Sequence, residues 1–447
     1  MRVGDAAGLN ILNTDVGTAL SVHLDYVDRS GAVWRTSSLP SSGASPCTLS
    51  HAQGALGPSS LSYWLETEGL PSLSSGNAAV VLPCHSSPAG APQASLLSDQ
   101  KTIAILALDG GTVTSLPFFG FLGARGSSTG MRQAVSTNAQ EFWVGGIASS
   151  QFGLRYLASR TSNTTVRVHG SLWFPETPPR YQAGSMDLRG VTLQGNQLYV
   201  TSSYVVEPNR NMEKPSYTPW GGVVRIGARG MIRRNQTYDG TLLRGFDGRR
   251  SFWTFLFEQT QSMWLIEDVG RYSRVSTLIS TQADAAAMLD VNGMAPASKP
   301  EQPAASRPWF YRDSVGTAIV NWKWNNAAGG RWAEVNATKT YLPGGEAAYS
   351  LAGRLEPQAG GIAMAWTLYT TTRSRLYRVR PAANTAGAVE VVRLAPAGTI
   401  YRGVALPPYQ DAPTASPSPT SSRTKLRPPT PSSTATRSKS RKPRREV

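Results

Sequence analysis

A strand, a short turn and a second strand recur along this chain, and this repeat is the strongest constraint on its fold. The unit is clearest in Arg189–Leu193, the turn at Gly195-Asn196, and Leu198–Ser202. An apolar strand led by Arg, a Gly-Asn turn and an aromatic strand predict a β-hairpin. Looser copies are Arg132–Val135 with Phe142–Gly145 and Arg250–Leu256 with Met263–Ile266. Such repetition predicts a repeat fold.

The composition fits many short strands joined by turns. The 447 residues include 43 Gly, 31 Pro, 12 Trp and 16 Tyr, and only 16% are charged. Aromatic residues favour strands, Gly and Pro favour turns, and the Ala/Glu/Lys/Leu bias of helical proteins is absent. We therefore expect an all-β protein.

Aromatic residues mark the second strand of each expected unit. Four short strands per unit, separated by loops of variable length, are typical of the blades of a β-propeller. We expect six blades, with seven as the alternative. The aromatic positions are Trp64, Trp143, Tyr199, Trp264 and Tyr369.

The two ends of this body lack strand partners of their own. The last strand, Tyr401–Leu406, has no following partner, and the segments near Val3, Val22 and Val33 have no preceding one. We predict that one C-terminal and three N-terminal strands form one blade and close the ring. Closure removes the exposed edges on which other chains would pair.

The character of the chain changes after the last expected strand. We predict a propeller-like domain over 1–408 and a disordered tail over 409–447, because Pro and like charges favour extended chain. From residue 412 onward there are nine Lys or Arg and one Glu, a net charge of +8 out of +16. The other half is spread over the body without a dense basic run, so we expect no nucleic-acid partner. We also expect the protein to be a monomer.

The two cysteines, Cys47 and Cys84, lack the spacing of a zinc site. We expect one disulfide between them, with two buried free thiols as the alternative. A bridge closing a loop of that length would stabilise the fold by roughly 4 kcal/mol on the chain-entropy model, in an oxidising compartment.

The compartment has two interpretations. No window of about 18 apolar residues is present, so no transmembrane helix is expected. Met1–Asp5 enters a strand-like pattern without an apolar targeting core. Either the protein is intracellular, or the start of the chain is missing from this sequence.

Motifs for catalysis and metal binding do not emerge. The histidines His23, His51, His85 and His169 lack metal-ligand spacing, and common hydrolase and nucleotide-binding motifs are absent. The neighbours Glu267 and Asp268 would point to opposite faces of a strand, which disfavours a catalytic pair. We assign no catalytic residue, no metal and no cofactor.

Arginine leads several expected first strands, which line the central channel of a propeller. One hypothesis is that these guanidinium groups ring one channel mouth and bind an acidic or sulfated glycan. The alternative is that each pairs with a neighbouring carboxylate or carbonyl, which the mutual repulsion of the cations favours. The set is Arg132, Arg189, Arg250 and Arg402.

Two further features bear on glycans. N-glycosylation sequons begin at Asn163, Asn235 and Asn336. Aromatic residues in second strands are expected in the core, whereas Trp220 and Trp309, in expected loops, are the better candidates for sugar contacts.

A resemblance to a known family rests on six stretches: Arg2–Asp5, Phe142–Gly146, Leu154–Leu157, Gly195–Ser202, Thr367–Thr371 and Arg402–Pro407. Together they resemble the secreted, β-propeller-like repeat proteins of volvocine green algae and some bacteria. The likeness spans about residues 1 to 408. It implies secretion, a propeller-like body and a cell-surface or matrix setting, and it carries over no catalytic residue. This sequence departs from the family in lacking a signal peptide and in its more basic tail.

The favoured interpretation is a non-enzymatic scaffold or binding protein, outside the cell or in the cell wall, that recognises acidic polysaccharide or matrix proteins. A propeller-based glycan hydrolase or lyase is one alternative. An intracellular or nuclear interaction platform is the other, since Lys439–Arg445 resembles a nuclear localisation patch.

Overall fold

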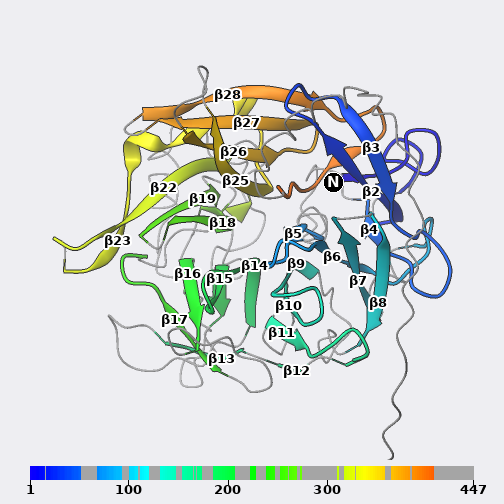
Figure 1. Ribbon diagram of the computed structural model, residues 1–447, viewed down its shortest axis with the longest axis horizontal. Helices are drawn as coiled ribbons and strands as arrows, with labels where there is room; N and C mark the ends of the chain where they lie inside the picture. The colour runs from blue at the N-terminus through cyan, green and yellow to red at the C-terminus, as the bar shows by residue number, and fades with distance from the viewer. Residues whose placement is uncertain are drawn as a thin grey trace, which may run out of the picture. The chain divides into compact units, whose positions relative to one another are not determined.

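The computed structural model of the chain consists of strands β1 to β29 joined by turns, with two short 3-10 helices in the part that it describes (Figure 1). The chain divides into two units, Met1–Pro408 and Tyr409–Val447. The second unit, including the predicted disordered tail, lies outside the described residues. The structure describes residues 1–406 except 16, 52–67, 93–99, 109–110, 120–130, 147–153, 165, 168, 174–184, 207–221, 228–237, 247–251, 260, 269–271, 274–309, 312–316, 328, 358–363 and 383–384.

The two ends of the first unit meet in one antiparallel group of strands. β29 (Ile400–Tyr401) pairs with β1 (Arg2–Val3), which pairs with β2 (Ala19–Val27), which in turn pairs with β3 (Val33–Ser38). Val3 lies opposite Ile400, and the Met1 nitrogen donates to the Gly403 carbonyl at 2.7 Å. One strand from the end of this unit therefore lies beside three from its beginning, the pairing that the sequence predicts.

The next group is joined to the first through the pairing of β2 with β4 (Thr48–Ser50). It continues through β6 (Ala79–His85), β7 (Lys101–Ala107) and β8 (Val113–Phe118). The short β5 (Ser72–Leu73) also pairs with β6. Together, the two groups form a nine-stranded sheet.

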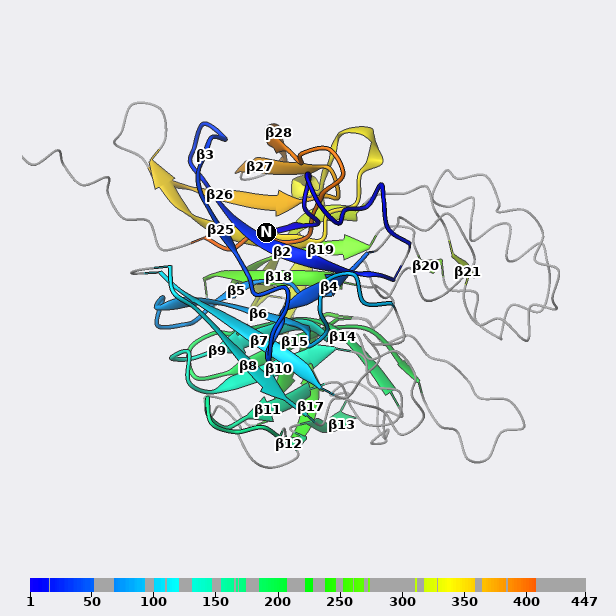
Figure 2. The ribbon, with the colours of Figure 1, turned by 90° about the vertical axis from the view of Figure 1, so that its right-hand side faces the viewer.

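The remaining sheets follow in chain order. Within Met1–Pro408 the four larger of these sheets succeed one another around a common centre in Figure 1, and Figure 2 shows the same sheets from the side, so the fold is all-β and β-propeller-like, as predicted. The first of these sheets consists of β9 (Met131–Ser136), β10 (Phe142–Gly146), β11 (Leu154–Leu157) and β12 (Val166–Arg167), and the second of β13 (His169–Trp173), β14 (Ser185–Leu193), β15 (Leu198–Val206), β16 (Gly222–Ile226) and β17 (Tyr238–Leu242). The third consists of β18 (Phe252–Gln259), β19 (Ser262–Asp268), β22 (Thr317–Asn325), β23 (Arg331–Glu334) and β24 (Thr340–Tyr341), and the fourth of β25 (Ser350–Pro357), β26 (Met364–Thr371), β27 (Arg375–Ala382) and β28 (Thr385–Leu394). The strands β20 (Tyr272–Ser273) and β21 (Phe310–Tyr311) form a separate pair.

The repeated hairpin forms as the sequence predicts. Leu193 of β14 lies opposite Leu198 of β15, and the Gln194 amide donates to the Gln197 carbonyl at 3.0 Å across the turn. Gly195 has φ +42°, a conformation that glycine adopts without steric cost. The Gly-Asn pair therefore sets the register of the hairpin.

The core lies between neighbouring sheets. Trp143, Trp264 and Tyr369, three of the repeat aromatics, are buried, which confirms their predicted core role. Trp143 packs against Tyr156 with ring centroids 5.2 Å apart. Burying an aromatic ring contributes about 2 to 3 kcal/mol, so these positions stabilise contacts between sheets. Trp64 lies outside the described residues.

Candidate functional site

Three of the four predicted channel arginines are described, and all three are buried. Arg132 on β9 is 0% exposed, and Arg189 on β14 and Arg402 after β29 are each 1% exposed. Arg250 lies outside the described residues. Their burial gives a large glycan no surface contact with these groups, and a shared anion site between them stays a prediction.

Arg402 belongs to a buried polar cluster that joins the end of the first unit to the second group of strands. Its guanidinium donates to the Ser50 carbonyl. The Ser50 hydroxyl donates to Glu68 Oε2 at 3.0 Å, and His85 Nε2 lies 2.8 Å from the same oxygen. Lys101 Nζ lies 3.2 Å from His85 Nδ1. All five residues have less than 4% of their surface exposed.

The contacts in this cluster assign the proton on His85. An ammonium group only donates, so Nδ1 accepts from Lys101, and the ring proton sits on Nε2, where it donates to Glu68. Burial lowers the pKa of His85, and the Lys101 and Arg402 charges lower it further, against the opposing carboxylate of Glu68. Burial alone would raise the pKa of Glu68, but His85, Arg402 and Lys101 lower it overall. Glu68 is therefore an anion among cations.

The chemistry of the cluster is structural. A hydrolytic triad needs a serine bonded to the histidine, whereas Ser50 bonds to Glu68. The cluster fixes Arg402, and with it the strand β29, to β4, β6 and β7. The sequence singled out Arg402 but not Glu68 or Lys101, because nothing in their spacing indicates that they meet.

A surface pocket of about 220 Å³ lies where β2 and β3 pass the segment after β29. Trp34 on β3 is 67% exposed and lies against Tyr26 on β2, with ring centroids 5.2 Å apart. The register between β2 and β3 shifts here: Tyr26 is opposite Arg35 and Val27 is opposite Val33, so Trp34 is the extra residue of a β-bulge. Bulges reorient side chains, and this one accounts for the exposure of Trp34.

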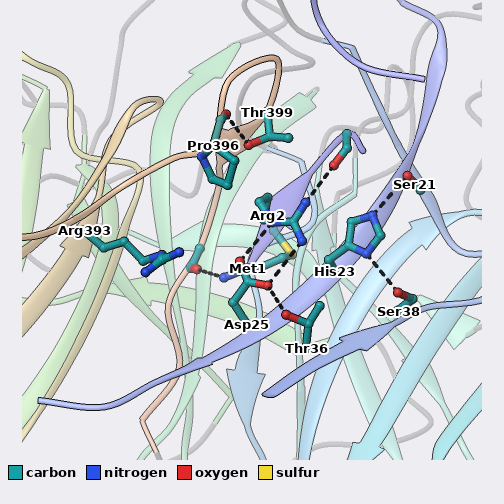
Figure 3. A network of polar contacts seen from close by, with 12 residues as sticks. Met1, Arg2, Ser21, His23, Asp25, Thr36, Ser38, Arg393, Pro396 and Thr399 are labelled. Atoms are coloured by element: carbon teal, nitrogen blue, oxygen red, sulfur yellow. Dashed lines mark hydrogen bonds and ion pairs between the residues drawn. The ribbon is translucent and has the colours of Figure 1, made fainter. Parts of the chain in front are cut away.

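Charged groups surround the two aromatic rings. Asp25 in the pocket wall lies 3.0 Å from Arg2 Nε and accepts from the Thr36 hydroxyl at 2.8 Å (Figure 3). Burial would raise the pKa of Asp25, but these bonds hold it below its usual value. The Arg35 guanidinium lies 5.4 Å from the Tyr26 ring centroid, a cation–π distance.

Arg354 also lines this pocket, and its Nε lies 2.8 Å from Glu356 Oε1. The remaining wall is apolar. It is formed by Met1, Leu24, Val27, Pro71, Val80, Leu106, Leu108, Ala405 and Leu406. The pocket thus combines an exposed indole, an apolar wall and the ion-paired Asp25 and Arg354, with the Arg35 guanidinium over the Tyr26 ring.

The other sequence predictions have mixed outcomes. Cys47 and Cys84 form the predicted disulfide, and both are fully buried. Asn163 and Asn336 are exposed, whereas Asn235, Trp220 and Trp309 lie outside the described residues.

Glu267 is buried on β19, and its carboxylate lies 3.1 Å from Lys339, which also contacts Glu334 at 3.0 Å. An ion-pair role accounts for this carboxylate. No group of three or more His, Cys, Asp or Glu in the described part of the chain is placed to hold a metal ion. Among the same residues, no helix is long and apolar enough to cross a bilayer.

Neither a scan against protein-family models nor a search of curated proteins gave a match to this chain.

Proposed function

We propose that this protein is a non-enzymatic binding protein of the cell surface or matrix, and that its pocket at Trp34 recognises an acidic glycan. The observation that carries the proposal is Trp34 itself, a large aromatic ring left two-thirds exposed by a bulge at the edge of a pocket. Exposed indoles are costly in water and are enriched in binding sites. An indole offers a flat apolar face to the C–H face of a sugar ring.

The charges around the pocket favour an acidic sugar over a neutral one. Arg354 lines the pocket, and Arg35 follows Trp34 on the same strand. Guanidinium groups bind carboxylates and sulfates through paired hydrogen bonds, and their five donors allow this beside contacts that they already make. A uronate or sulfated sugar stacked on Trp34 would place its charge between them.

Two features support a binding protein with a rigid scaffold at the cell surface or in the matrix. The buried Cys47–Cys84 disulfide is compatible with an oxidising, extracellular compartment. The pairing of β29 with β1 supports a ring of about six blades closed by the two ends of the body. A closed ring would present the pocket on a rigid scaffold, which lowers the entropic cost of binding.

The test is calorimetric titration of the full chain with uronate-containing, sulfated and neutral oligosaccharides. We expect acidic ligands to bind, more weakly as salt rises, and Trp34→Ala to reduce affinity at least tenfold. Tyr341→Ala is the matched control, because Tyr341 is also an exposed aromatic, at 52%, but it is on β24 in another sheet and does not line the pocket. Equal affinity of Trp34→Ala and the wild type, or stronger binding of the neutral sugars, would overturn the proposal.

A further inference from the structure

A second pocket, of about 410 Å³, lies at the start of β29 and has a different character. It is formed by the turn before β29, the turn between β26 and β27, and the segment before β25. Its volume falls in the range of small-molecule sites. Most of its wall is apolar: Ile11, Ala347, Tyr349, Ala395, Pro396, Ala397 and Ile400.

Two charged side chains line this second pocket, Arg373 and Glu346. Glu346 forms an ion pair with Arg375 and accepts a hydrogen bond from the Thr372 hydroxyl at 2.5 Å. The charge of Glu346 is therefore matched by Arg375, and Arg373 makes the pocket cationic. The guanidinium has five N–H donors, so it can hold a carboxylate in addition to its existing contacts.

Two hydroxyl groups of the wall, those of Thr372 and Thr399, are committed to the protein. Thr372 donates to Glu346, and the Thr399 hydroxyl donates to the Pro396 carbonyl at 2.7 Å. A ligand covered with hydroxyl groups would lose its hydrogen bonds to water against the apolar wall without replacing them. The pocket thus favours a ligand with an apolar body and one negative charge.

His51 provides a probe of the charge on Arg373. Its ring is buried, with Nδ1 3.0 Å from the Asp15 carbonyl and 3.1 Å from the Thr14 hydroxyl. Burial lowers the pKa of His51, the bond to Asp15 opposes this, and the positive charges of Arg402 and Arg373 lower it further. An anion bound to Arg373 should therefore raise the pKa of His51.

We propose that the second pocket binds an organic carboxylate with an apolar body, the carboxylate on Arg373 and the body against Tyr349 and Ile400. Such a group occurs in free aryl or alkyl carboxylates and at the C-terminus of peptides that end in an apolar residue. The proposal is independent of the glycan site, because the two pockets share no lining residue.

The experiment titrates the full chain with four probes: 4-phenylbutyrate, its neutral analogue 4-phenylbutanol, N-acetyl-Phe-Leu with a free carboxylate, and the same dipeptide as an amide. We expect at least one carboxylate to bind at least tenfold more tightly than its neutral partner. Arg373→Gln should remove that difference, while Arg331→Gln, an exposed arginine on β23, should keep it. NMR of the His51 ring should show its pKa rise when the carboxylate binds the wild type.

The two carboxylates distinguish the source of the ligand. Tighter binding of the dipeptide acid than of phenylbutyrate indicates a peptide terminus, and the reverse order indicates a free small molecule. The proposal is overturned if neither carboxylate binds, if the neutral probes bind equally well, or if Arg373→Gln binds like the wild type. The comparison of probes on the wild-type protein stands even if Arg373→Gln misfolds.

Discussion

Neighbouring groups of strands are held together by different kinds of contact in two regions of the molecule. In the charged junction, formed by Ser50, Glu68, His85, Lys101 and Arg402, buried polar groups connect β29 to the second group of strands. In the apolar junction, formed by Gln133, Gly145, Gly190 and Val191, the strand β14 packs closely against β9, β10 and β18 within a large hydrophobic cluster, and Gly190 is the residue that faces β18. The Val191 amide donates to Gln133 Oε1 at 2.8 Å there.

The lengths of the strands explain the difference. At the charged junction β4 has only three residues, and a single residue pair, Thr48 with His85, connects it to β6. At the apolar junction β9 pairs with β10 over five positions. A long ladder orders its backbone by itself, whereas a short one needs side chains and a covalent bond to do so. Next to this single pair, the Cys47–Cys84 disulfide joins the segment before β4 to β6.

Removing the disulfide is expected to have the largest effect. The bridge spans 37 residues, so the double variant Cys47→Ser/Cys84→Ser should lose about 4 kcal/mol of unfolding free energy on the chain-entropy model. Urea denaturation of variant and wild type measures this loss. The wild type unfolded in the presence of reductant is the control and should match the variant. A loss below about 1 kcal/mol would mean that the side-chain contacts suffice to hold β4.

Removing the charge of Glu68 should have the next largest effect. Glu68→Gln keeps an oxygen acceptor for Ser50 and His85 but leaves Lys101 and Arg402 without their buried anion. Breaking a buried ion pair by removing one partner costs about 3 kcal/mol or more. Thermal unfolding with Glu390→Gln as control isolates the effect of burial, because Glu390 pairs with Arg378 at the surface. Equal destabilisation by the two variants would refute a special role for the buried cluster.

A methyl group at the apolar junction tests the close packing there. A Cβ on Gly190 would lie 2.8 Å from Thr201 Oγ1 and 3.1 Å from the Thr254 Cα. Gly190→Ala should therefore cost about 2 kcal/mol through overpacking. Gly8→Ala is the control, because a Cβ there makes ordinary contacts. Chemical denaturation measures both, and an unchanged Gly190→Ala would show that the sheets can separate without loss.

The sequence predicts the apolar junction better than the charged one. Periodic apolar residues and the turn at Gly195 determine the hairpin locally, so β14 and β15 follow from the pattern. The cysteines were identifiable as the pair that forms the disulfide. Glu68, His85 and Lys101 come together only after three separate segments pack against one another. No local sequence pattern indicates that these side chains meet. The parallel pairing of β13 with β17 likewise depends on tertiary packing.

The pocket at Trp34 illustrates the same limit. The sequence indicates Trp220 and Trp309 as candidates for sugar contacts, and both lie outside the described residues. The exposed Trp34 is in a strand and is not among those candidates. Its exposure comes from one extra residue in the pairing of β2 with β3. A bulge shifts the inward and outward alternation by one residue, and the sequence does not indicate where that shift occurs.

The smallest expected effect is the pH dependence of the charged junction. His85 has a pKa below its ordinary 6.5 in the folded protein, because it is buried beside Lys101 and Arg402. Below pH 6.5 the unfolded chain therefore takes up a proton that the folded chain does not, so the free energy of unfolding falls as the pH falls. The slope approaches about 1.4 kcal/mol per pH unit for one such group.

His85→Gln removes this proton-binding difference, so its unfolding free energy should fall by about 1 kcal/mol less than that of the wild type between pH 7 and pH 5.5. His23→Gln is a useful comparison, because burial also lowers the pKa of His23 but its ring is nearer the surface and bonds to Ser21 and Ser38 (Figure 3). The substitution His23→Gln should therefore reduce the pH dependence of the unfolding free energy by less than His85→Gln does. Parallel curves for His85→Gln and the wild type would mean that Glu68 fully offsets the burial and the neighbouring cations, so that His85 keeps its ordinary pKa in the folded protein.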